Sequence, residues 1–84
     1  MRLPIIKHVS NFIQEHDKDW VVETLELLED LCDARGIKDE ELDVIGELMS
    51  NLEGALEVQN MIKEGMTQKE ALNIFMKRVS SIGQ

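Results

Sequence analysis

The side chains that could bind a metal or act as nucleophiles are few, and their spacing matches no common site. The chain has two histidines, His8 and His16, and one cysteine, Cys32. A carboxylate-bridged di-iron bundle needs a glutamate three residues before each histidine, and neither histidine has one. A structural zinc site needs four cysteine or histidine ligands, which is more than the chain contains. We therefore expect no metal site.

The same scarcity argues against catalysis. Cys32 follows Leu28 by one helical turn and precedes Asp33. We expect it to pack as a small apolar side chain, because acidic neighbours oppose the activation of a thiol. No glycine-rich phosphate loop is present, and no serine has both a histidine and a strained turn nearby in the sequence. The sequence therefore predicts a protein that is not an enzyme, with no catalytic residues and no cofactor.

Charge is distributed unevenly along the chain. Seventeen acidic residues against nine basic residues give a net charge of -8. Residues 15–47 include thirteen acids and three bases, whereas the first fourteen residues and the last twenty-four each carry a net charge of +2. Nucleic-acid binding needs a basic surface, so DNA and RNA are not expected partners. The asymmetry could attract a basic partner or orient one copy against another; the simpler alternative is a solvated acidic face.

The composition fits one cytoplasmic helical domain over residues 1–84. Aromatic residues are scarce, so the core must consist of Leu, Ile, Val and Met, a composition that suits helices better than sheets. One cysteine permits no intrachain disulfide and gives no sign of an oxidising compartment. No apolar run approaches the roughly 20 residues of a membrane span, so we expect no membrane association.

Apolar residues recur every three or four positions in four segments, which predicts four amphipathic helices. Pro4 suits the first turn of a helix over residues 4–15. Asp17 can cap a second helix over residues 18–35, which Gly36 would close. Acidic residues from Asp39 onward favour the start of a third helix over residues 39–64, and Gly65 supplies its end.

The fourth segment has the strongest local signal. Thr67 and Glu70 have the spacing of a capping box directly before an apolar-periodic stretch, which predicts a helix over residues 68–80. Four amphipathic helices joined by short connections predict an all-α fold, a small helical bundle with a long third helix.

A line of small residues on the third helix predicts a contact surface. Gly46, Ser50 and Gly54 recur at intervals of four, and Val58 and Met61 extend the apolar surface beyond one stripe. Each interior glycine costs roughly 1 kcal/mol relative to alanine, and small residues permit close approach of another helix. We therefore expect a homodimer with the third helix near its centre. The alternative is that other helices of the same chain cover this helix.

Three segments resemble a small family of uncharacterised bacterial proteins of about this length: LPIIKH (residues 3–8), KDEELDVIGEL (38–48) and MIKEGMTQKEALNIFMKRV (61–79). The resemblance covers nearly the whole chain and implies no activity or ligand. It also implies a redox-associated partner protein, thioredoxin-like or peroxiredoxin-like. Cys32 is the residue on which such a role would be tested.

These observations favour a non-enzymatic protein–protein interaction module that acts as a homodimer. Two alternatives stay open. A small-molecule or metal-binding helical protein would use a pocket between helices. The carboxylates of the second helix are the only plentiful side chains that could act as ligands there. An acidic regulator would mask a basic surface on its partner, and only the charge supports it.

Overall fold

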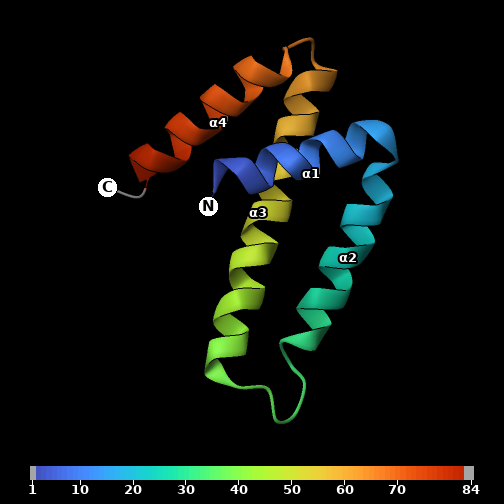
Figure 1. Cartoon of the computed structure of the whole chain (residues 1–84), viewed down its shortest axis with the longest axis vertical. Coiled ribbons are helices and arrows are strands. Elements are labelled where there is room, and N and C mark those ends of the chain that lie inside the picture. The colour runs from blue at the N-terminus through green and yellow to red at the C-terminus, as the bar shows by residue number, and fades with distance from the viewer. Residues whose placement is uncertain (1, 83–84) are drawn as a thin grey trace.

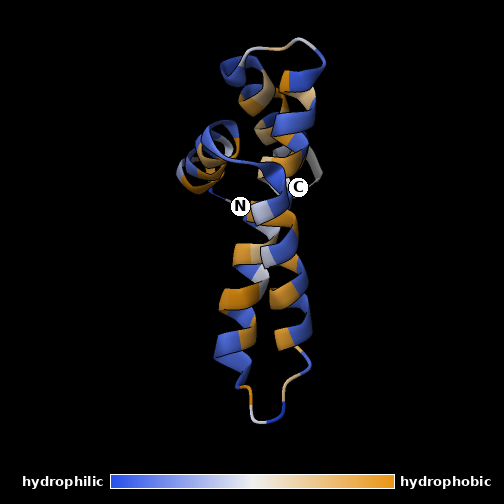
Figure 2. Ribbon diagram, turned by 90° about the vertical axis from the view of Figure 1, so that its right-hand side faces the viewer, coloured by the Kyte–Doolittle hydropathy of each residue, from blue (hydrophilic) through white to orange (hydrophobic). Residues whose placement is uncertain are grey.

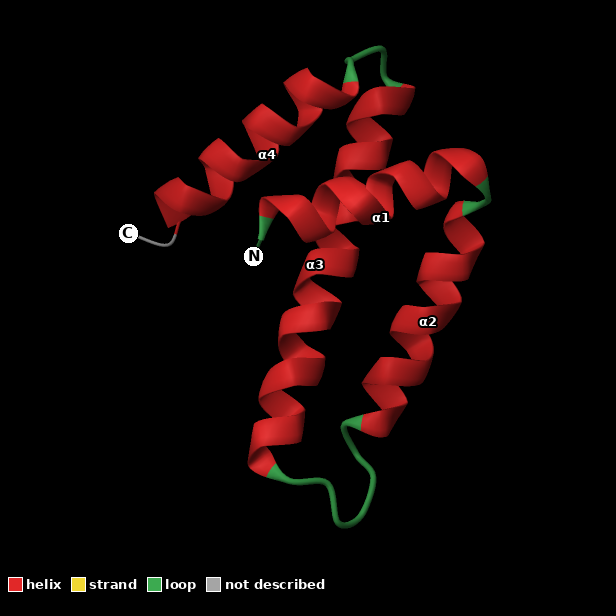
Figure 3. Cartoon of the chain, viewed as in Figure 1, coloured by secondary structure: helices red, strands yellow, loops and turns green. Residues whose placement is uncertain are grey.

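The computed structural model describes residues 2–82, which form four α-helices (Figures 1 and 3). They are α1 (Leu3–Glu15), α2 (Lys18–Leu31), α3 (Asp39–Lys63) and α4 (Gln68–Ile82). No strand occurs within residues 2–82, and α3 is the longest helix there, which confirms the predicted all-α fold. Residues 1, 83 and 84 of the predicted domain lie outside the described residues. Within the described range, no helix has both the length and the apolarity that crossing a membrane requires.

The helix ends follow the local signals in the sequence. The Asp17 side chain accepts a hydrogen bond from the Asp19 backbone N–H at 3.1 Å, as an N-cap does. Thr67 and Glu70 form the predicted capping box, in which each side chain accepts from the other residue's backbone N–H at 3.1 Å. Gly65 ends α3 at φ +112°, a conformation that glycine adopts without strain.

Helix α2 ends at Leu31 instead of Arg35, the predicted end. After Leu31 the backbone N–H groups of Asp33 and Ala34 bond to carbonyls three residues back, so the last turn tightens. An acidic residue such as Asp33 is unfavourable at a helix C-terminus, and the residues from Asp33 to Gly36 are all exposed. Packing therefore does not extend the helix, and Gly36, at φ +82°, lies in the following loop.

Helix α3 is the centre of the fold. It contacts each of the other helices, whereas α2 and α4 do not touch each other among the described residues. Helices α2 and α3 form an antiparallel hairpin, α1 crosses one face of α3, and α4 packs beside the upper half of α3 away from α2 (Figure 1). The main core lies where α1 and α4 meet α3, and its buried members are Ile6, Ile13, Val21, Ala55, Val58, Ala71, Leu72 and Phe75.

The fold is open for its size. The radius of gyration is 13.7 Å, against about 12 Å for a compact chain of this length. The accessible surface is 6024 Å², against about 5100 Å² for a folded monomer of this mass. The lower half of the hairpin contributes to this openness, because no third helix of the described residues lies on it (Figure 1). Ile45 is the one buried residue between positions 22 and 50.

Candidate functional site

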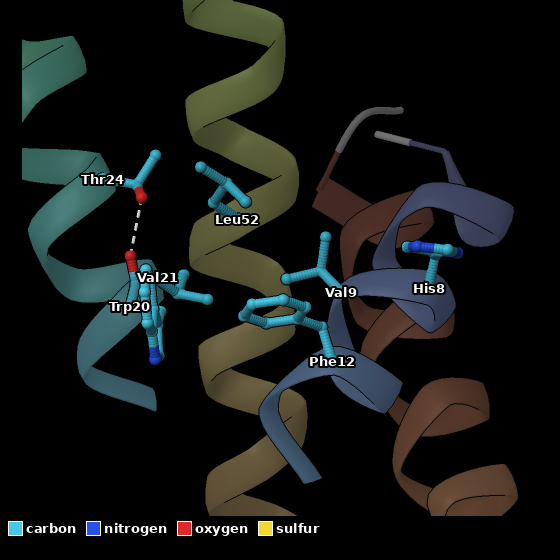
Figure 4. Close-up of a pocket in the computed structure, with 7 residues that line it drawn as sticks. All are labelled: His8, Val9, Phe12, Trp20, Val21, Thr24 and Leu52. Atoms are coloured by element: carbon cyan, nitrogen blue, oxygen red, sulfur yellow. Dashed lines mark hydrogen bonds between the residues drawn. The ribbon is translucent and has the colours of Figure 1, made fainter. Parts of the chain in front are cut away.

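An apolar cleft lies where α1 crosses the hairpin. Its volume is about 240 Å³. Three helices contribute to its walls, and the lining side chains are His8, Val9 and Phe12 from α1, Trp20, Val21 and Thr24 from α2, and Leu52 from α3 (Figure 4). The α1–α2 connection is short, so it holds the two aromatic residues on adjacent walls.

Aromatic contacts form one side of this cleft. The Phe12 and Trp20 rings meet edge to face, with centroids 6.5 Å apart and an angle of 88° between their planes. This is a favoured geometry for aromatic pairs. The His16 ring lies against the same phenyl group, with centroids 4.3 Å apart. Trp20 is nevertheless 61 % exposed, so these contacts leave most of the indole uncovered.

The polar group of Thr24 in the cleft wall is already satisfied. The Thr24 hydroxyl donates to the Trp20 carbonyl oxygen at 2.6 Å, one turn earlier in α2 (Figure 4). The remaining surface is mostly aliphatic or aromatic, apart from the imidazole of His8 at its edge. The cleft therefore suits an apolar side chain or another apolar group better than a charged ligand.

A line of exposed apolar side chains continues from the cleft toward the hairpin tip. On α2, Trp20, Leu27 and Leu31 share one face with Thr24, because they recur at intervals of three or four. On α3, Val44 and Leu48 precede Leu52 at intervals of four. Since Trp20, Thr24 and Leu52 all line the cleft, both lines lie on the face that α1 crosses. We call Trp20, Leu27, Leu31, Val44 and Leu48 the hairpin strip.

The hairpin strip is far more exposed than apolar residues in a packed helix pair. Leu27 and Val44 are 65 % and 60 % exposed, and Leu31 and Leu48 exceed 40 %. Apolar segments continue down both helices of the hairpin, and the first turn of α3 at the lower end is hydrophilic (Figure 2). Scattered apolar residues are normal on a protein surface, but a contiguous patch marks an interaction site. The hairpin strip and the cleft together form the candidate site.

Acidic side chains occupy the other side of α2. Glu26, Glu29, Asp30 and Asp33 surround a shallow depression there. Between residues 2 and 82, no three His, Cys, Asp or Glu side chains come together in a way that could hold a metal ion. Cys32 is a half-buried free thiol at the end of α2.

The surface predicted from small residues on α3 is divided in the structure. Gly46 is exposed and Ser50 is half-buried. Gly54 is buried, and a methyl group placed there would lie 2.9 Å from Cζ of Phe75. Val58 is fully buried and Met61 packs half-buried against the same core. Close approach by α4 of the same chain therefore explains the small residue at position 54.

The hairpin strip was not identified in the sequence, although a signal for it exists. Trp20, Val21, Leu28 and Leu31 read as one apolar face of the second helix. In a helix, the line through Trp20 and Leu31 lies about 80° from the line through Val21 and Leu28. The first line is exposed, whereas Val21 is buried and Leu28 half-buried. The unusual width of the apolar face was the available signal.

Residues 1–82 match one protein family, described as a family of unknown function (DUF6952). No curated protein and no solved structure matches the chain.

Proposed function

The chain belongs to this family of unknown function, and we propose that it is a non-enzymatic protein–protein interaction module that acts as a homodimer. The contact in this proposal runs along the hairpin strip. Gly54 and Val58, which belong to the surface predicted from small residues, are covered by the chain's own core, so they are not part of this contact. Helix α3 stays at the centre of the proposed dimer.

The uncovered lower half of the hairpin carries the proposal. A helix with an apolar stripe must bury it against another element, and below α1 no helix among the described residues lies on this face of the hairpin. The accessible surface exceeds the value for a compact monomer of this mass by roughly 900 Å². A standard interface removes about 800 Å² from each partner. A second hairpin laid on the first would cover the exposed side chains of the hairpin strip and complete a four-helix arrangement.

A second copy suits this surface better than a small molecule does. The cleft is open and is continuous with a strip that extends to Leu31, near the hairpin tip, which is longer than a small ligand would cover. The acidic side of α2 stays exposed in such a dimer. We propose that side, with Glu26, Glu29, Asp30 and Asp33, as the surface for a basic partner protein.

The single tryptophan of the chain gives a direct test. Trp20 is 61 % exposed in one copy and belongs to the hairpin strip. Sedimentation equilibrium should show a reversible monomer–dimer transition in the micromolar range. Trp20 emission should move to shorter wavelength over the same concentrations, because the indole leaves water. A monomer throughout this range, with constant emission, would refute the homodimer.

A further inference from the structure

We infer that the two copies lie antiparallel, with the two hairpin strips face to face and Leu31 of each copy in the cleft beneath α1 of the other. This inference rests on the proposed homodimer and specifies its geometry. The occupant of the cleft is thus a second copy of the chain. Each cleft is complete only when the partner subunit supplies its Leu31 side chain.

The position of α1 excludes a parallel arrangement. Helix α1 stands as an extra layer on the same face as the hairpin strip, at the upper end of the hairpin (Figure 1). In a parallel pair, α1 would meet α1 of the partner subunit. Packed helices lie 8–10 Å apart, so two such layers would hold the strips roughly 25 Å apart. In an antiparallel pair, each bare lower half lies beside α1 of the other copy instead of against it.

The length of the strip sets the register. Leu31 lies eleven residues after Trp20 on α2, a rise of roughly 16 Å. A two-fold axis through the middle of the strip brings Leu31 of the partner subunit level with Trp20. The cleft opens to solvent there, because its lining residues Phe12 and Trp20 are 36 % and 61 % exposed. Leu31 is itself 41 % exposed, so in one copy it has an uncovered apolar side chain to place in this opening.

Charge favours the same orientation. Residues 30–43 around the hairpin tip include six acids and two bases. The first fourteen residues, which include most of α1, contain Arg2 and Lys7 and no acid. An antiparallel pair separates the two acidic tips and places each at the α1 end of the partner subunit, where Arg2 and Lys7 lie as well as the acids Glu15, Asp17 and Asp19. A parallel pair would place the two acidic tips together, and like charges at an interface are unfavourable.

Cross-linking through one cysteine per chain tests this geometry. The first protein is the natural chain, with its single thiol at Cys32, and the second carries Cys32→Ser with His8→Cys at the exposed edge of the cleft. A short bifunctional maleimide should link the two proteins when they are mixed. Neither protein alone should cross-link, because the two Cys32 thiols of an antiparallel pair lie at opposite ends of the interface.

The other results overturn the inference in distinguishable ways. A dimer by sedimentation in which Cys32 links to Cys32 would refute the antiparallel geometry while the homodimer stands. A dimer by sedimentation that gives no cross-link between the two mixed proteins would also refute the antiparallel geometry while the homodimer stands. A monomer by sedimentation, with no link in any sample, would refute the homodimer itself and leave the cleft to another occupant.

A measurement on the natural cysteine background guards against misfolding of the His8→Cys protein. In the antiparallel dimer, Leu31→Ala uncovers Trp20 of the partner subunit, so emission of the dimer shifts to longer wavelength. Leu3→Ala, a similarly exposed position on α1, is the matched control and should leave the emission unchanged. A Leu31→Ala dimer with unchanged emission would contradict the register.

Discussion

Replacement of Leu27 by alanine should weaken the homodimer strongly while leaving the single copy nearly as stable. Leu27 lies near the middle of the hairpin strip and is 65 % exposed. Full burial of a leucine side chain contributes about 1.5–3 kcal/mol, so covering this exposed fraction contributes about 1–2 kcal/mol. Each dimer contains the residue twice. The expected loss is about 2–4 kcal/mol, which raises Kd roughly 30-fold to 700-fold.

The assay compares Kd by sedimentation equilibrium and by dilution of Trp20 fluorescence. Ile74→Ala is the matched control, because Ile74 is 46 % exposed on α4, away from the strip. Thermal unfolding of either variant as a monomer should differ from the natural chain by no more than about 0.5 kcal/mol, as expected for exposed positions. If Leu27→Ala changes Kd by less than about threefold, which is below 1 kcal/mol, the strip is not the dimer contact. If Ile74→Ala raises Kd as much as Leu27→Ala does, that result would also refute the strip as the dimer contact.

Two further predictions concern α3 and α4. Replacement of Gly46 or Gly54 by alanine gains the same helix propensity, about 1 kcal/mol. At Gly54 the new methyl group lies 2.9 Å from the buried Phe75 ring. At Gly46 nothing lies within 4 Å of the new methyl group. The Gly54→Ala protein should therefore be about 1–3 kcal/mol less stable than the Gly46→Ala protein in urea unfolding, and equal stabilities would contradict the packing described for α4. Hydrogen bonds from the Thr67 backbone N–H and hydroxyl hold the pKa of Glu70 below its ordinary value. The ionised Glu70 carboxylate therefore stabilises the fold at pH values above the ordinary pKa of glutamate. This stabilisation is lost as the pH falls through the lowered pKa of the folded state. The natural chain should lose stability on acidification relative to Glu70→Gln, and parallel pH profiles of the two proteins would argue against the capping box.

The short-range features of this protein were available in its sequence. Asp17 caps α2, and the pair Thr67 and Glu70 forms its box at the start of α4, as expected. Gly65 ends α3 where the pattern indicated. These features depend on groups within about four residues of each other, so the local sequence contains everything needed to form them. The spacing of apolar residues along the sequence was likewise sufficient to predict the number of helices and the all-α class.

Tertiary structure decided which apolar faces are covered. Gly46 and Gly54 looked equivalent on one line of α3, but α4 packs against Gly54 alone. Leu31 and Val21 looked alike on α2, but α1 and the upper part of α3 cover only Val21. A periodic pattern specifies which side of a helix is apolar, but the burial of that side depends on where distant helices lie. The described residues place no such helix on the lower hairpin, and for that reason the exposure of the candidate site was decided only by the folded chain.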